Sequence, residues 1–207
     1  MKKQWIVGLL LAGLALTITG ATLILRTLPA GPAPAGELKT VTEFTDGKPL
    51  PGFRLNGPGG AVTQADLHGK WSFVFFGYTQ CPDICPTALS LMKHLKTIVG
   101  AGGTAFQVVF ISLDPKRDTR ELLDQYMAAF DPTFIGLRGD DAELQPLLKD
   151  LGVFFQRNDS TDAKNYTVDH SAGIYLIEPK GSLRAVFSPP QNAERMAADF
   201  WRITTAK

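Results

Sequence analysis

Two cysteines, four positions apart, are the residues whose type and spacing most directly suggest chemistry. Cys81 and Cys85 are the two cysteines among 207 residues. A disulfide between them would close too short a loop to stabilise the fold much. A pair this close therefore indicates redox chemistry or metal binding. The alternative, two small buried apolar residues, is disfavoured by their position among Pro82 and Pro86 at a strand end.

The elements around the cysteines predict where the two sulfurs lie. The apolar run Trp71–Gly77 predicts a buried central strand, and Pro86–Val99 has helical spacing, with Pro86 as its first residue and Cys85 as its cap. The pair would then lie at the carboxyl edge of the sheet, near the positive end of a helix, which favours thiolate. Two thiolates suit Cu(I), with Zn(II) as a competitor.

A third donor is needed to complete a metal site, and His170 is the candidate. It lies just ahead of the apolar segment Gly173–Ile177, expected to be a strand beside the central one. On residue type alone, a hydrogen-bonded loop histidine is the stronger alternative. Asp169 would at most orient the region from outside the ligand set. Asp114 is expected at the same sheet edge, either approaching the metal or acting in a turn.

The rest of the pattern predicts an α/β fold with a mixed sheet flanked by helices. His68 and His94 are expected to be solvated or structural. A hydrophobic content of 44%, a charged content of 20% and a net charge of +1 indicate a globular domain with no electrostatic reason to bind nucleic acid. The expected elements are a hairpin over 52–63, strands over 71–77, 106–112, 133–137, 173–177 and 183–187, and helices over 86–99, 119–130, 140–151 and 191–204.

The N-terminus predicts a membrane anchor. The run Trp5–Leu25 has no charged residue and would span about 31 Å as a helix, which matches a bilayer core. Lys2 and Lys3 precede it, so the domain is expected on the extracytoplasmic side. The predicted organisation is an anchor over 1–26, a Pro/Ala/Gly-rich linker over 27–44 and a domain over 45–207. A cleaved signal peptide is the alternative.

Three sequence blocks resemble the Sco/SenC family of copper chaperones. They are FGYTxCPDICP at Phe76–Pro86, SxDPxRDT at Ser112–Thr119 and YxVDHS at Tyr166–Ser171. The resemblance implies a thioredoxin-like fold with one N-terminal transmembrane helix, and one copper ion per chain held by Cys81, Cys85 and His170. It also implies that the two cysteines can form a redox-active disulfide.

The resemblance further implies a role in assembling the dinuclear copper site of cytochrome c oxidase subunit II. The expected partners are that subunit and other copper chaperones. The expected location is the bacterial inner membrane, single-pass, with the domain facing the periplasm.

An enzymatic alternative is a thiol–disulfide oxidoreductase, with Cys81 as nucleophile and Cys85 as resolving thiol, which would act on the oxidase copper-site cysteines. The three-residue spacer, and the absence of proline from residues 166–173, argue against a pure thioredoxin activity. A thiol peroxidase is a further alternative.

Overall fold

The computed structural model describes residues 40–102, 105–158 and 166–205. These residues fall in one compact unit, residues 39–207. The expected anchor, and the linker up to residue 39, lie outside the described residues. No helix in the described part of the chain has both the length and the apolar character needed to cross a bilayer.

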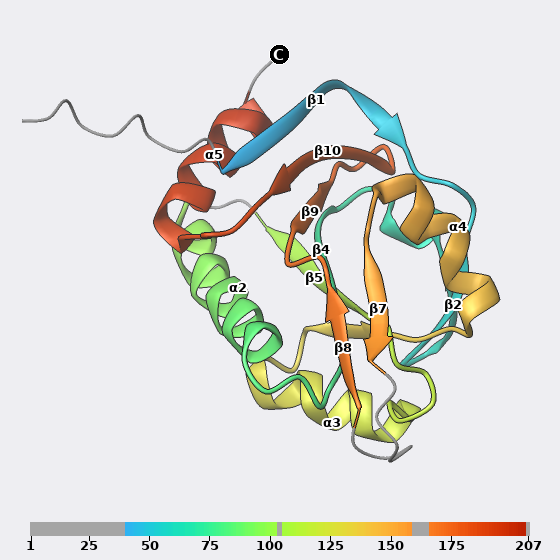
Figure 1. Ribbon diagram of the computed structural model, residues 1–207. Helices are drawn as coiled ribbons and strands as arrows, with labels where there is room; N and C mark the ends of the chain where they lie inside the picture. The colour runs from blue at the N-terminus through green and yellow to red at the C-terminus, as the bar shows by residue number, and fades with distance from the viewer. Residues whose placement is uncertain (1–39, 103–104, 159–165, 206–207) are drawn as a thin grey trace, which may run out of the picture. The chain divides into compact units, whose positions relative to one another are not determined.

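A six-stranded mixed sheet forms the centre of the fold (Figure 1). In order across the sheet, its strands are β1 (Val41–Pro49), β10 (Ser182–Phe187), β9 (Ile174–Ile177), β4 (Trp71–Gly77), β5 (Phe106–Ser112) and β6 (Ile135–Leu137). β4, β5 and β6 run parallel, whereas β9, β10 and β1 pair antiparallel. The expected mixed sheet, with β9 beside the central strand β4, is therefore confirmed.

Helices cover both faces of this sheet. They are η1 (Gln64–Leu67), α2 (Ile84–Ala101), α3 (Arg120–Phe130), α4 (Asp141–Leu151) and α5 (Ala193–Thr205). Successive residues of β4 point to opposite faces, as a pleated strand requires. Phe73 packs on Phe200 of α5, with ring centroids 5.5 Å apart, whereas Val74 shares an apolar pocket with Leu147 and Leu151 of α4. The expected flanking of the sheet by helices is thus confirmed.

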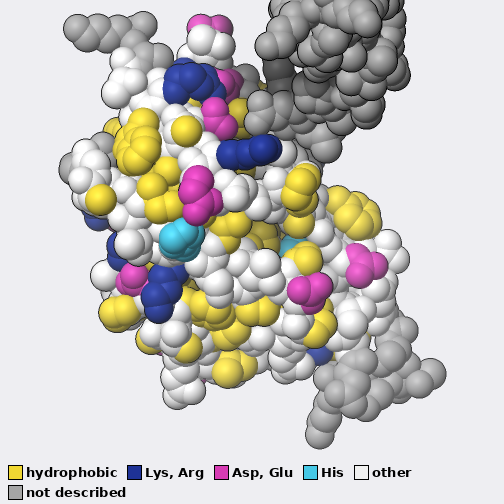
Figure 2. All heavy atoms as spheres, turned by 90° about the vertical axis from the view of Figure 1, so that its left-hand side faces the viewer, with side chains coloured by type: hydrophobic (Ala, Val, Ile, Leu, Met, Phe, Trp, Pro, Cys, Tyr) yellow, Lys and Arg dark blue, Asp and Glu magenta, His cyan; other side chains and the backbone are white. Residues whose placement is uncertain are grey.

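The surface over α2 and α5 has mixed character. Figure 2 views the molecule from the side on which these helices lie in Figure 1, and it shows charged side chains of both signs scattered among apolar ones. Basic side chains do not gather into a patch on this face.

Three strands were missed by the sequence pattern. β1 begins at Val41, inside the range assigned to the linker, so the fold starts before residue 45. β7 (Phe155–Asn158) and β8 (Thr167–His170) pair antiparallel in a separate two-stranded sheet. These strands were missed because they are short or polar and their residues are mostly exposed or half-buried, so they lack a continuous apolar run. The expected hairpin is present as β2 (Arg54–Gly57) and β3 (Gly60–Thr63).

Candidate metal centre

The carboxyl end of β4 places the first part of the site. β4 pairs with β5 along its whole length, which brings Gly77 opposite Ser112. Gly77 has a steric role, because a Cβ on it would lie 2.6 Å from the Cys85 Sγ and 2.9 Å from the Phe110 ring. The absence of a side chain at this position therefore lets the first turn of α2 pack directly against the end of β4.

The helix that carries Cys85 begins earlier than the sequence predicted. α2 starts at Ile84, with Asp83 as its N-cap, so Cys85 lies in the first turn and is not the cap. Pro86 is tolerated at this position because N–H groups in a first helical turn have no partner within the helix. Cys81 lies before the helix, in a turn where its N–H donates to the Tyr78 carbonyl at 3.2 Å.

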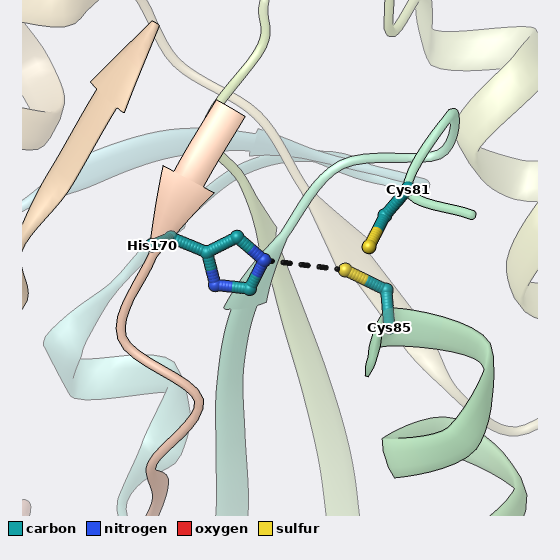
Figure 3. Close-up of side chains that lie close together, drawn as sticks. All are labelled: Cys81, Cys85 and His170. Carbon is teal, nitrogen blue, oxygen red and sulfur yellow. Dashed lines mark hydrogen bonds between the residues drawn. The ribbon is translucent and has the colours of Figure 1, made fainter. Parts of the chain in front are cut away.

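His170 reaches the cysteines from the β7–β8 hairpin. It is the last residue of β8 and lies opposite Phe155 of β7, so it belongs to a strand and not to a loop. Its Nε2 lies 3.4 Å from the Cys85 Sγ (Figure 3). Its Nδ1 lies 3.0 Å from the Ser171 carbonyl oxygen. In the tautomer with its proton on Nδ1, the ring donates to that carbonyl and directs the Nε2 lone pair at the sulfurs, as a metal ligand requires; with its proton on Nε2, the ring donates to the sulfurs instead.

The ring of His170 is also fixed by aromatic neighbours. It meets Phe75 and Tyr78 edge to face, with centroid distances of 5.9 and 6.2 Å. Both aromatic side chains are almost completely buried. The imidazole is therefore set against aromatic side chains, with its Nε2 facing the thiols.

The three side chains form a cluster of the size that a metal ion requires. The Sγ atoms of Cys81 and Cys85 and a ring nitrogen of His170 all lie within 4.8 Å of one another. Donors that are each about 2.3 Å from one ion can be at most ~4.6 Å apart, so only a small adjustment is needed. Cys85 is inaccessible and Cys81 is 9% exposed, so Cys81 is the outer of the two sulfurs. Two sulfurs and one imidazole favour a soft ion.

The two thiols differ in their protonation. The pKa of Cys81 is lowered to about 5, first because Cys85 donates a hydrogen bond to its sulfur. Backbone N–H groups at Asp83 and Cys85, and the His170 ring, lower this pKa further, whereas burial opposes them. The pKa of Cys85 is raised, because this thiol supplies the proton of that hydrogen bond and is deeply buried. Cys81 is therefore the thiolate of the pair.

The two acidic candidates occupy different surroundings. Asp114 is completely buried, and its carboxylate accepts hydrogen bonds from the Arg117 Nε and the Tyr166 hydroxyl. It therefore supports the site from behind the ligand cluster. Asp169 is exposed and accepts a hydrogen bond from the Asn158 side chain at 2.8 Å. As the neighbour of His170 in a strand, it points to the other side.

The role of Asp118 was not apparent from the sequence. Either Asp118 or Thr119 could cap α3 by its residue type, and the N-cap is Thr119, whose hydroxyl accepts a hydrogen bond from the Leu122 N–H. Asp118 is fully buried and bonds to Thr79 and Ser112. A residue beside a helix cap gives no sequence signal that it turns inward.

The other two histidines lie away from the cluster. His94, on α2, is exposed and pairs with Glu194 of α5 at 3.2 Å. His68 packs against the turn at Gly181. A Cβ added at Gly181 would lie 2.4 Å from the His68 Nε2. Both therefore have contacts of their own, as expected for solvated or structural histidines.

Comparisons with known proteins agree with this arrangement. The SCO1/SenC family model matches residues 48–205. A SCO2-like protein of Rickettsia prowazekii is 39% identical over 131 residues, covering 62% of this chain and 64% of that protein. A putative copper-binding protein of Stutzerimonas stutzeri is 42% identical over 125 residues, covering 60% and 61%. The chain thus spans less than two thirds of the length of these relatives.

The likeness extends to a solved structure. ScoI of Bradyrhizobium japonicum with copper bound is 36% identical, with a TM-score of 0.67, over 75% of this chain and 99% of that one. The family match covers more than half of the chain and all three site residues. Together with the thioredoxin-like fold, it shows that this chain belongs to the SCO1/SenC family.

Proposed function

We propose that this protein is a copper chaperone that holds one copper ion with Cys81, Cys85 and His170. The observation that carries the proposal is the convergence of these three donors, which come from two segments far apart in the sequence. The copper-bound state of a related ScoI supports the choice of metal. Cu(I) suits two thiolates and an imidazole, because all three are soft or intermediate donors.

The surroundings of the donors suit metal that is held and then passed on. Phe75 and Tyr78 keep water from one side of the imidazole, and Cys85 is inaccessible to solvent. Cys81 is the more accessible sulfur and is already deprotonated at neutral pH, because its pKa is about 5. An incoming thiolate of a partner would therefore replace Cys81 first, while Cys85 and His170 retain the ion.

A copper titration tests the metal site, with the domain of residues 39–207 in its reduced form. We expect one equivalent of Cu(I) to bind, with loss of binding in Cys81→Ser and Cys85→Ser. Affinity should fall by at least about tenfold, or ~1.4 kcal/mol, in His170→Ala. The matched control is His94→Ala, which removes an imidazole from α2 without touching the cluster. Unchanged affinity in His170→Ala would show that the third donor is wrong.

Within the cell, the proposed partner is cytochrome c oxidase subunit II, and the proposed task is to support assembly of its dinuclear copper site. The family membership and the resemblance of the three sequence blocks support this partner. The uncharged run Trp5–Leu25 supports a single-pass tether in the bacterial inner membrane, with the domain in the periplasm and other copper chaperones as further partners.

The cellular role is tested by the copper content of the oxidase in cells that lack this protein. Restoring the wild-type chain should restore that copper content, whereas His170→Ala should not. A His94→Ala chain serves as the control for expression. Full oxidase copper in cells without the protein would contradict the proposed role.

The difference in pKa between the two thiols favours a second candidate function, which is thiol–disulfide exchange with the partner's copper-site cysteines. The Cys81 thiolate would attack one sulfur of a partner disulfide and release the other as a thiolate. Cys85, after losing its proton, would then attack the mixed disulfide, which leaves a Cys81–Cys85 disulfide here and a reduced dithiol on the partner. Turnover of a disulfide-bonded peptide without copper, unaffected by His170→Ala, would favour this candidate.

A further inference from the structure

The segment Ser112–Thr119 supplies no donor to the ligand cluster, yet it contacts both of the segments that do. It begins at the last residue of β5, which lies beside the end of β4. Its Leu113 N–H donates to the Gly77 carbonyl at 2.7 Å, immediately before the cysteine loop. Two of its side chains, Asp118 and Arg117, then reach in different directions.

Asp118 holds the cysteine loop. One of its carboxylate oxygens accepts a hydrogen bond from the Thr79 hydroxyl at 2.6 Å, and the other accepts from the Thr79 backbone N–H at 3.1 Å. The Ser112 hydroxyl donates to the same carboxylate at 2.6 Å. Thr79 lies two residues before Cys81. A fully buried carboxylate with three donors thus fixes the backbone from which the outer sulfur extends.

Arg117 holds the strand that carries His170. Its guanidinium lies 3.6 Å from the centroid of the Tyr166 ring, and its Nη1 donates to the Tyr166 carbonyl at 2.9 Å. Tyr166 is the residue immediately before β8. Asp114, itself completely buried, fixes the other side of this arrangement through Arg117 and the Tyr166 hydroxyl. The same Nη1 also donates to the Gln80 side chain at 3.2 Å, beside Cys81.

These contacts matter because His170 does not lie on a strand of the central sheet, so the hydrogen bonds of that sheet do not fix its position. β8 pairs only with β7 among the described strands. Hydrogen bonds between backbone strands therefore do not tie the hairpin to β4, and side-chain contacts help to connect the two. We propose that Asp118 and Arg117 are positioning residues, which set the separation between the two thiols and the imidazole. The copper part of this proposal rests on the proposed function above.

Two truncations test the two connections. Asp118→Ala removes the acceptor for Thr79, and Arg117→Met keeps an apolar stem against the Tyr166 ring while removing the guanidinium. Loss of residues that orient metal ligands typically weakens metal affinity by about 10- to 100-fold, and we expect losses in this range for Cu(I). In Arg117→Met, X-ray absorption should report both sulfur donors but a weaker imidazole contribution.

Two control variants make the same kinds of substitution, of an aspartate and of an arginine, at positions away from the site. Asp131 accepts from the N–H and the hydroxyl of a single threonine, Thr133, as Asp118 does from Thr79. Arg120 also joins separate segments, through the carbonyls of Asn56 and Gly136. Asp131→Ala and Arg120→Met should lower the melting temperature of the metal-free protein but leave copper affinity within about twofold.

A measurement on the metal-free protein separates this proposal from the proposed function. Proton–proton contacts between His170 and Cys85, seen by NMR, should weaken in Asp118→Ala and Arg117→Met but persist in both controls. If the wild-type protein bound no copper and this pattern were still seen, the positioning roles would stand and the copper function would fall.

The proposal is overturned if Asp118→Ala and Arg117→Met fold, lose thermal stability as the controls do, and keep both the His170–Cys85 contacts and wild-type copper affinity. If Asp118→Ala does not fold, Thr79→Val removes only the hydroxyl connection and Asp118→Asn keeps the shape of the side chain. The positioning role is supported if both variants bind copper more weakly than the wild type, with a larger loss of affinity in Thr79→Val than in Asp118→Asn. Wild-type affinity in both overturns it.

Discussion

The two halves of the ligand cluster are held by different kinds of structure. Cys81 and Cys85 follow β4, which lies between β5 and β9 in the middle of the central sheet and is buried along most of its length. His170 ends β8, one strand of a two-stranded hairpin whose residues are mostly exposed or half-buried. The thiols therefore share the stability of the main core, whereas the imidazole depends on a smaller unit and its side-chain contacts.

This difference separates what holds the two kinds of donor. The sulfur pair lies on a rigid base, and the imidazole lies on an element that can move at lower cost. Changes at the β4–α2 junction should act on the whole fold, and changes in the β7–β8 hairpin should act locally. The following tests probe that contrast, from the largest expected effect to the smallest.

The largest effect concerns the protonation of the thiol pair. In the reduced, metal-free protein, the pKa of Cys81 is lowered from 9.0 to about 5. Its thiolate should therefore persist at neutral pH and disappear as the pH falls through about 5. The stabilisation linked to this shift is present above the ordinary pKa and is lost as the pH falls through the lowered one. Ultraviolet absorbance of the thiolate, measured against pH, follows this change.

The same titration in His170→Ala sharpens the comparison. His170 is one of the smaller causes of the lowered pKa of Cys81, and the Cys85 hydrogen bond is the largest. The midpoint should therefore rise only modestly in His170→Ala and much more in Cys85→Ala. Equal shifts in the two variants would show that the hairpin controls the thiols as strongly as their own junction does.

Gly77→Ala should destabilise the whole domain. The added methyl group would meet the Cys85 sulfur and the Phe110 ring at under 3.0 Å, so core side chains must move. Overpacking of this kind costs about 1–3 kcal/mol of unfolding free energy. Gly100→Ala is the control in the last turns of α2, where nothing lies within 4 Å of the added Cβ, and it should be neutral or slightly stabilising. Urea unfolding of the metal-free proteins distinguishes the two.

Ser171→Ala should loosen the hairpin without unfolding the domain. The Ser171 hydroxyl accepts a hydrogen bond from the Phe154 N–H at 2.9 Å, and losing such a bond costs about 1 kcal/mol. We expect faster amide hydrogen exchange in β7 and β8, with β4 and β5 unchanged. Uniformly faster exchange in all four strands would mean that the hairpin and the central sheet open together, and the contrast between them would be lost.

The smallest effect is expected for His94→Ala. His94 and Glu194 form an exposed pair between α2 and α5, and such pairs contribute at most about 1 kcal/mol. Calorimetry should show a melting temperature close to that of the wild type, with copper affinity unchanged. A marked loss of affinity would show that α2 transmits strain from its exposed side to Cys85.

Much of the cysteine half could be predicted from the sequence because its signals are local. The apolar run of β4, the prolines around the cysteines and the helical spacing after them place both sulfurs at a strand–helix junction, as observed. The start of α2 was misplaced by two residues. Pro86 has a preference for the first helical position, but it is also compatible with a place later in the first turn, and a sequence pattern does not separate the two.

The position of His170, on the β7–β8 hairpin, could be found only from the tertiary structure. β7 and β8 contain too few apolar residues to show a period, so His170 looked like a loop residue, and only the family resemblance assigned it to the metal. Nothing local to Asp118 or Arg117 indicates that one reaches the cysteine loop and the other the start of β8. The amino-acid sequence by itself specified the donors and the junction that presents two of them. Their convergence depends on packing between segments 85 residues apart, which exists only once the chain has folded.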